Sequence, residues 1–176
     1  MREIIVHAYQ YDELSTEAKA TAIENCSQIN VSFDWWDQVY DDAKDVGIEI
    51  QKFDIGRGNF CKIVISGFST DVANNIVKQH GVSCETYQIA ETFLRKEKDL
   101  SNEIDKYRDR EDQEGINSFD GACEDYHYLL EKFTKDLERA YLKLLGEEYA
   151  YLTSEDAIIE SILSNAWEFT EKGELI

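Results

Sequence analysis

The chain of 176 residues has no proline, few cysteines and few histidines. Its cysteines, which form no CxxC pair, are Cys26, Cys61, Cys84 and Cys123. The three histidines are isolated from one another as well. Because structural zinc sites need closely spaced cysteine and histidine ligands, this scatter argues against zinc and favours buried free thiols. The absence of proline predicts an ordered chain with few rigid loops.

Long apolar runs are also missing. No stretch approaches the roughly 20 apolar residues that span a bilayer, and the opening MREIIVHAYQYDEL acquires acidic residues too early for a signal peptide. Hydrophobic residues make up 43% and aromatic residues 12% of the chain, which is enough for a core. We therefore expect a cytosolic protein of one domain, or one domain with a helical extension.

Signatures of common catalytic sites are absent too. The sequence contains no GxxxxGK[ST], GxGxxG or GxSxG motif. Residues 54–59, DIGRGN, have the glycines of a phosphate loop, but they connect two predicted strands and not a strand and a helix N-terminus. A cysteine nucleophile would need a histidine in space, and nothing favours Cys61 or Cys84. The sequence thus predicts no catalytic residue, cofactor or metal.

Residues 32–68 predict a helix, a stop, and a strand hairpin. Ser32 or Asp34 is a candidate helix cap, and an apolar stripe follows at three- and four-residue steps, at Trp36, Val39, Tyr40, Ala43 and Val46. Gly47 is well placed to end the helix in a left-handed conformation. The linker IGRGN has two glycines, which suit a hairpin turn that needs positive φ.

The rest of the chain indicates an α+β fold with a small, mostly antiparallel sheet. Residues 2–10, 48–54 and 60–66 are expected to form that sheet, and the final GELI could rejoin it. Residues 15–29 predict a helix that Ser15 or Thr16 caps, with a face of small side chains suited to close approach. Thr153 is expected to cap a last helix, with Ile158, Ile159, Ile162 and Leu163 turned inward.

A protruding antiparallel helical hairpin is predicted between these parts. Residues 84–113 carry an apolar seam at Ile89, Phe93, Leu100, Ile104 and Tyr107. Residues 114–121, EGINSFDG, are expected to form the loop, and residues 122–145 the second helix. We therefore predict an α+β domain over residues 1–83, completed by about 146–176, with residues 84–145 as a helical hairpin insertion.

Charge is the most unusual feature of the sequence. The formal net charge is −19, and it is uneven: residues 1–55 carry −8, residues 56–110 carry +1, and residues 111–176 carry −12. Such a surface repels nucleic acid and anionic membranes and attracts basic partners. Simple solubility is the alternative explanation, and it stays open.

A resemblance covers most of the chain. The segments YQYDELSTEAKATAIEN, DWWDQVYDDAKDVGIEIQKFDIGRGN, CETYQIAETFL and EYAYLTSEDAIIESILSNAWEFTEKG resemble a group of small, acidic, uncharacterised accessory proteins of phages and prophages. The group has no established catalytic residues to carry over. The resemblance implies an accessory gene of a phage or mobile element, expressed in a bacterial cytoplasm, and small acidic proteins of that context include anti-CRISPR and antirestriction proteins that mimic DNA.

Charge and resemblance together predict a non-catalytic inhibitor of a host defence effector, a CRISPR nuclease or a restriction enzyme, that binds its basic nucleic-acid-binding surface. The acidic residues expected to contact this partner are Asp34, Asp37, Asp41, Asp42, Asp45, Glu147, Glu148, Glu155 and Asp156. One alternative is a structural or regulatory phage protein that dimerises through the helical hairpin. Another is a hydrolase that uses clustered carboxylates with a divalent metal.

Overall fold

The structure, a computed structural model, describes residues 7–176 and divides the chain into two compact units. Unit 1 contains the described residues 7–37 and 146–176, and unit 2 contains residues 38–145. Helices predominate, and the few short strands pair antiparallel and pack against helices, which confirms the predicted α+β class. Each unit is described by itself below.

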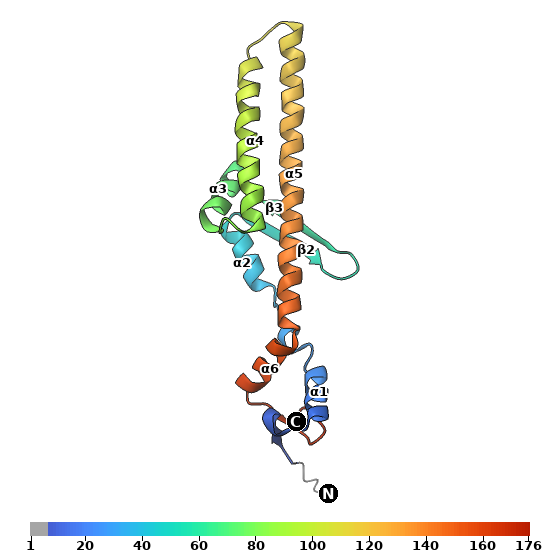
Figure 1. Ribbon diagram of the computed structural model, residues 1–176. Helices are drawn as coiled ribbons and strands as arrows, with labels where there is room; N and C mark the ends of the chain where they lie inside the picture. Colours follow the sequence, from blue (N-terminus) through green and yellow to red (C-terminus); the bar gives the residue numbers. More distant parts are fainter. Residues whose placement is uncertain (1–6) are drawn as a thin grey trace. The chain divides into compact units, whose positions relative to one another are not determined.

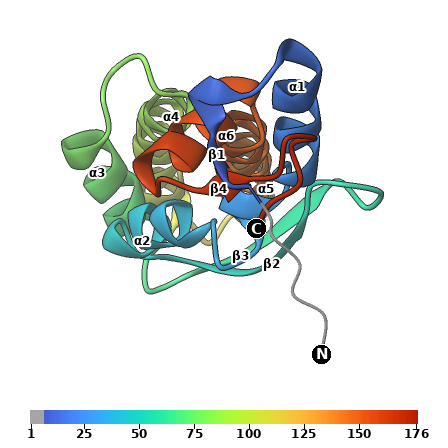
Figure 2. The same ribbon diagram turned by 90° about the horizontal axis from the view of Figure 1, so that it is seen from below.

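Unit 1 is built from short elements taken from both ends of the chain (Figure 2). They are β1 Tyr9–Gln10, the 3₁₀ turn η1 Tyr11–Glu13, α1 Thr16–Asn25, the 3₁₀ turn η2 Ile29–Val31, α6 Glu155–Ser164 and β4 Glu168–Phe169. Their buried core is formed by Tyr11, Leu14, Ala18, Ala22, Cys26, Ile158, Ile162 and Phe169. Apolar side chains that are far apart in sequence thus bury one another, and this burial stabilises the unit.

The small-residue face of α1 is covered by a tight turn near the C-terminus. Ser15 caps α1, as predicted, because its hydroxyl accepts the backbone N–H of Ala18 at 3.2 Å. Gly173 lies against Ala18 and Ala22 with a φ of +85°, and a Cβ at this position would overlap the Ala18 carbonyl oxygen. The amide of Asn25 donates to the Gly173 carbonyl at 3.3 Å. The segment that closely approaches this face, as predicted, is therefore the backbone of the turn at Gly173.

The last helix differs from the prediction at both its cap and its apolar face. Ser154, not Thr153, caps α6, since the Ser154 hydroxyl accepts the N–H of Ala157 at 3.3 Å. The Thr153 hydroxyl instead donates to the carbonyl of Tyr149 at 2.7 Å. Leu163 is 48% exposed and does not turn inward as predicted. Ile158 and Ile162 are buried and Ile159 packs partly buried against the same core, as predicted, so the apolar face differs from the prediction only at Leu163.

Unit 2 holds the longer helices and a strand hairpin (Figure 1). Its elements are α2 Asp37–Asp45, β2 Ile48–Asp54, β3 Phe60–Ile65, α3 Ser69–Gln79, α4 Glu85–Tyr107 and α5 Gln113–Leu152, of which the first residue of α2 and the last seven of α5 belong to unit 1. The largest fully buried side chains of unit 2 are Tyr141, Phe93, Ile48, Ile76, Leu137, Leu145, Val46 and Val72.

The prediction of a single sheet is wrong. β1 pairs with β4 within unit 1, and β2 pairs with β3 within unit 2, each as a separate two-stranded sheet. Phe169 of β4 is fully buried and its ring lies edge-on to Tyr11 at 6.5 Å, so core packing fixes this pairing. Leu175 of GELI bridges to Phe169, so the final segment rejoins only the β1–β4 sheet. Residues 2–6 of the predicted first strand lie outside the described residues.

The helix of the central stretch begins later than predicted. Neither Ser32 nor Asp34 caps it: the Ser32 hydroxyl donates to the carbonyl of Ile29 at 3.1 Å, and α2 starts at Asp37. Ala43 and Val46 of the predicted stripe are fully buried. The apolar spacing thus located the inward face of the helix correctly, although it did not locate the first residue.

The turns of the central stretch are only partly as predicted. Gly47 follows α2 with a φ of +92°, as expected for a helix stop. In the β2–β3 turn, however, the positive φ of 45° belongs to Asn59 and to neither glycine. The carboxylate of Asp54 accepts the N–H groups of Gly56 at 2.7 Å and Gly58 at 2.9 Å. The turn is therefore held by a side chain that reaches back to its own loop.

The predicted helical hairpin is formed by α4 and α5, which run side by side in Figure 1. Phe93 stacks on Phe133 with ring centroids 4.2 Å apart, and Lys143 forms an ion pair with Glu85 at 2.9 Å. The sequence number rises along one helix as it falls along the other, which confirms the antiparallel arrangement. Both stacked rings are 2% exposed.

The predicted loop of this hairpin is wrong. Residues 114–121 are helical within α5, and the chain reverses over residues 108–112 instead. The carboxylate of Asp112 receives the N–H of Gly115 and the guanidinium of Arg110, and these hydrogen bonds hold its pKa below the ordinary value, that to Arg110 contributing most. A helix-interior glycine costs only about 1 kcal/mol, so two glycines did not suffice to interrupt α5.

The boundary between units also differs from the predicted division at residues 83 and 84. Residues 38–83 belong to the same unit as the hairpin. Val72 and Ile76 of α3 are fully buried, and His80 at its end bonds to Thr86 of α4. The hairpin therefore shares one core with the β2–β3 sheet and its helices.

Candidate acidic interaction surface

Carboxylates dominate the surface of unit 1. Over residues 1–37 and 146–176 the sequence has 15 acidic and 3 basic residues, a net charge of −12. Of the acidic residues that the structure describes there, all are exposed except Glu148, which is half-buried. Five of the residues predicted to contact a partner belong to this exposed set: Asp34, Asp37, Glu147, Glu155 and Asp156.

The described carboxylates of unit 1 differ from those of unit 2 in their ion pairs. Among the described residues of unit 1, none forms an ion pair with a basic residue of the same unit, and the ammonium of Lys19 lies over the Tyr11 ring at 5.4 Å. Unit 2 differs, because Glu138 pairs with Lys62 at 3.1 Å and Asp136 with Lys132 at 2.8 Å. The carboxylates that the structure describes in unit 1 therefore face solvent without ion pairs.

Packing within unit 1 brings its two acidic segments next to each other. The ring of Trp35, which follows Asp34, lies 5.4 Å from the ring of Tyr149, which follows Glu147 and Glu148. The side chain of Asn30 ties the same region to the end of α5 and the start of α6, donating to the carbonyls of Leu152 at 3.0 Å and Ala157 at 3.3 Å. Six of the nine predicted acidic residues thus belong to one unit.

The other three predicted residues, Asp41, Asp42 and Asp45, lie on α2 within unit 2. Asp41 and Asp45 are exposed. Asp42 has partners inside the unit: one carboxylate oxygen accepts the Tyr141 hydroxyl at 3.3 Å, and the other lies 3.4 Å from Nε2 of His80. Asp42 therefore helps to hold the fold, a role that the sequence did not reveal.

A polar network extends from the exposed Asp42 into the core of unit 2. Nδ1 of His80 lies 2.7 Å from the hydroxyl of Thr86, and the two side chains are 8% and 3% exposed. Burial, together with the charge and hydrogen bond of Asp42, raises the pKa of Tyr141, so its hydroxyl stays a donor. No local pattern links these four residues.

The order Thr86, His80, Asp42 resembles the order of groups in a hydroxyl nucleophile relay. A nucleophile, however, must be presented to its substrate, and the Thr86 side chain is buried between α3 and α4. Nε2 of His80 is also too far from Asp42 for a well-formed hydrogen bond. The geometry supports a structural role, joining α2, α3, α4 and α5.

The described part of the chain offers neither a metal site nor a membrane span. Within residues 7–176, no group of three or more histidine, cysteine, aspartate or glutamate side chains is arranged to hold a metal ion. None of the helices in this part of the chain has both the length and the apolar composition needed to cross a membrane.

Comparisons with protein-family models, with curated proteins and with solved structures found no match to this chain. The resemblance to phage and prophage accessory proteins thus stays a prediction.

The thiol of Cys61 on β3 is buried, and burial raises its pKa from 9.0 to about 11, with a further increase from the charge of Glu138 and an opposing effect of Lys62. A thiol with so high a pKa is protonated near neutral pH and a poor nucleophile. Cys61 is therefore a core residue of unit 2.

Because Cys61 is buried as a neutral thiol, we expect the folded chain to lose stability at alkaline pH. Because its pKa is higher in the folded chain than in the unfolded one, its contribution is complete below pH 9 and lost as the pH rises to about 11. The loss should reach about 2–3 kcal/mol, measured as the free energy of unfolding in urea across this pH range. Cys61→Ala should flatten that dependence, whereas Cys84→Ala, at an exposed site, should not. Equal slopes for both variants would contradict the assignment.

Proposed function

We propose that this chain is a non-catalytic, acidic accessory protein of a phage or mobile element. In the cytoplasm of a bacterial host it inhibits a defence effector, a CRISPR nuclease or a restriction enzyme, by occupying the effector's basic nucleic-acid-binding surface as a DNA mimic. The observation that carries the proposal is the net charge of −12 of unit 1, whose described carboxylates are almost all exposed and form no ion pair with a described cation of the same unit.

The arrangement of these carboxylates suits such a partner. DNA carries one charge per about 1.7 Å of helix axis, whereas carboxylates one turn apart on a helix are about 5.4 Å apart. The carboxylates of a single helix are too far apart to match the charge density of DNA, so several segments must contribute. Unit 1 draws its acids from the segment Asp34–Asp37, the end of α5 and the start of α6, which the contacts of Trp35 and Asn30 tie together.

A second candidate function belongs to a different class, a structural or regulatory phage protein that dimerises through the helical hairpin. Tyr128 on α5 supports it, since this large side chain is 68% exposed. In that case the acidity serves solubility alone. Size-exclusion chromatography with light scattering separates the two candidates, because only this one requires a dimer.

The test of mimicry is capture from a bacterial host lysate on the immobilised chain. We expect a nucleic-acid-binding protein to be retained at about 50 mM salt and released by duplex DNA or by about 200 mM salt. Replacing Asp34, Glu147 and Asp156 by lysine should weaken its binding at least tenfold, roughly 1.4 kcal/mol or more. A metal-dependent hydrolase would instead show saturable stabilisation by Mg²⁺ or Mn²⁺.

A matched variant controls for net charge. Asp99, Glu103 and Glu124 are exposed residues of unit 2, and replacing them by lysine changes the net charge equally. We expect this variant to keep its affinity to within about threefold, because its substitutions lie outside the acidic surface of unit 1. Equal losses in both triple variants would mean that only net charge matters. Retention of no nucleic-acid-binding protein would refute mimicry.

A further inference from the structure

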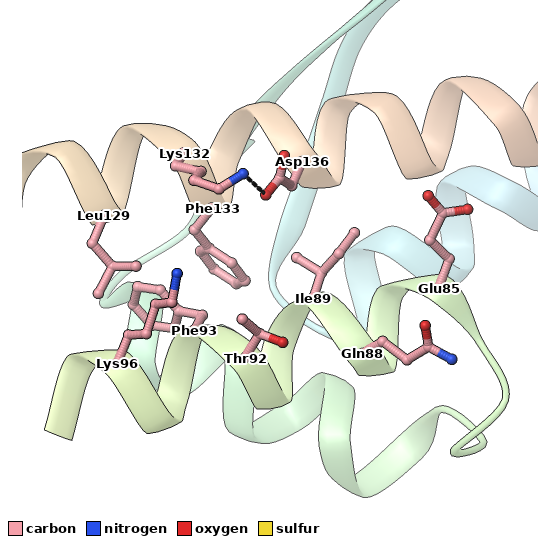
Figure 3. Close-up of a pocket in the computed structure, with 10 residues that line it drawn as sticks. All are labelled: Glu85, Gln88, Ile89, Thr92, Phe93, Lys96, Leu129, Lys132, Phe133 and Asp136. Carbon is pink, nitrogen blue, oxygen red and sulfur yellow. Dashed lines mark hydrogen bonds and ion pairs between the residues drawn. The ribbon is translucent and has the colours of Figure 1, made fainter. Parts of the chain in front are cut away.

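Unit 1 carries large aromatic side chains at its surface. Phe33 is 66% exposed and Tyr151 is 60% exposed, while Tyr149 is half-buried. The stacked rings of unit 2 differ, because Phe93 and Phe133 lie between α4 and α5 and are 2% exposed (Figure 3). Single exposed apolar side chains are common on proteins, whereas those that gather in one region are typical of a binding surface.

Two contacts bring the exposed rings of unit 1 into one region. The ring of Trp35 lies 5.4 Å from the ring of Tyr149 on α5. The side-chain amide of Asn30 donates to the carbonyl of the last residue of α5 at 3.0 Å. The segment from Asn30 to Trp35 therefore runs beside the last turn of α5. Phe33 belongs to that segment and Tyr151 to that turn, so the two exposed rings come from segments that pack on each other.

Carboxylates lie among these rings. Asp34 follows Phe33 directly in the chain. Glu147 precedes Tyr151 by four residues within α5, so both side chains lie on one face of the helix. Both carboxylates are exposed, and neither forms an ion pair with a described cation of unit 1. A partner that covers the rings must also neutralise these carboxylates, because a carboxylate buried without a cation is strongly destabilising.

A guanidinium group suits both the rings and the carboxylates. It is planar and stacks on an aromatic face, and its N–H groups pair with a carboxylate through two parallel hydrogen bonds. The ammonium group of lysine is a strongly hydrated point charge that offers no flat face to a ring. A neutral apolar partner would leave the carboxylates unpaired, and a nucleic acid would be repelled.

We propose that this surface binds arginine side chains of a basic protein and distinguishes them from lysine. The guanidinium groups stack on Phe33 and Tyr151, and the carboxylates of Asp34 and Glu147 accept their N–H groups. This inference rests on the proposed function in one respect, that the partner of unit 1 is basic, and it adds which basic side chain that partner presents.

Calorimetric titration of the full chain with three peptides at about 50 mM salt tests the proposal. The peptides have equal length and alternate glycine with six arginines, six lysines or six citrullines. We expect the arginine peptide to bind about fivefold more tightly than the lysine peptide, the sum of cation–π contacts at two exposed rings. It should bind at least tenfold more tightly than the citrulline peptide, which has a similar shape and no charge.

A double variant locates the preference on the surface. Phe33→Leu with Tyr151→Leu removes both rings at exposed positions and keeps apolar side chains there. The preference for arginine over lysine should fall below about twofold, and the affinity for the lysine peptide should change less than about twofold. Tyr128→Leu removes a 68% exposed ring from unit 2, and this matched control should keep the full preference.

The inference would be overturned by equal affinities for the arginine and lysine peptides, or for the arginine and citrulline peptides. A preference that survives in the double variant, or that is lost in the Tyr128→Leu protein, would overturn it as well. The two proposals fail separately. An arginine preference without capture of a nucleic-acid-binding protein from the lysate refutes mimicry alone, whereas capture without an arginine preference refutes this inference alone.

Discussion

Gly173→Ala is expected to lower the free energy of unfolding by about 2–5 kcal/mol. The φ of +85° costs a residue with a Cβ about 1–2 kcal/mol, and forced overpacking costs about 1–3 kcal/mol more. The obstacle is the backbone of α1 at Ala18, which cannot move aside as a flexible side chain would. Urea denaturation followed by tryptophan fluorescence measures the effect in the right place, since Trp35, Trp36 and Trp167 all belong to unit 1.

Gly146→Ala is the matched control. Gly146 lies inside α5 and belongs to unit 1, and a Cβ there meets nothing within 4 Å. The substitution should therefore stabilise the helix by about 0.5–1 kcal/mol, the difference between glycine and alanine in a helix interior. The two variants should move stability in opposite directions. A Gly173→Ala protein as stable as the parent would show that the turn does not pack on α1 as described.

Phe133→Ala is expected to destabilise unit 2 by about 3–5 kcal/mol, the usual cost of removing a buried phenylalanine ring. The ring is 2% exposed and stacks on Phe93, so its loss leaves a cavity on the hairpin seam and removes the favourable ring contact. Unfolding in urea followed by far-UV circular dichroism reports this change, because helices dominate the unit.

The control for this variant is Tyr128→Ala on the same helix. Tyr128 is 68% exposed, and its removal should change stability by no more than about 0.5 kcal/mol. A double-mutant cycle with Phe93→Ala isolates the stacking itself, for which we expect a coupling of about 0.5–1.5 kcal/mol. Strictly additive effects of the two phenylalanine variants would argue against direct contact between the rings.

The helical hairpin could be predicted because apolar residues recur at helical spacing along the seam between its two helices. Phe93 and Phe133 both fall on the predicted stripes, and the structure stacks one on the other. The loop could not be predicted from its glycines. Whether Gly115 and Gly121 are accepted inside a helix depends on how much stability the longer α5 gains from packing. Propensity is a weak prior that tertiary packing overrides.

The pairing of strands was predicted less well than their existence. β2 and β3 are neighbours in sequence and joined by a short turn, so their pairing follows from local pattern. β1 and β4 have two residues each, too few to show alternation, and their pairing depends on the burial of Phe169. The alternating pattern identifies strands but does not say which sheet receives them.

Exposure of the acidic residues was predictable, and their partners were not. Charged side chains are seldom fully buried unless paired, so a solvated set at positions such as Asp34 and Glu147 follows from residue type alone. Asp42 differs because His80 and Tyr141 reach it from other helices. Such convergence depends on the tertiary fold, which a single sequence without aligned relatives does not display.

The discontinuity of unit 1 has a consequence for synthesis on the ribosome. Unit 2 is one continuous stretch, residues 38–145, and is complete as soon as that stretch has emerged, since domains generally fold as units during translation. The partner that β1 needs, Glu168–Phe169, is translated after unit 2. Residues 7–37 therefore cannot complete their packing until the C-terminal residues have been synthesised. Until then the apolar side chains of α1 stay uncovered. Slow closure of such distant contacts exposes the nascent chain to aggregation and to chaperones.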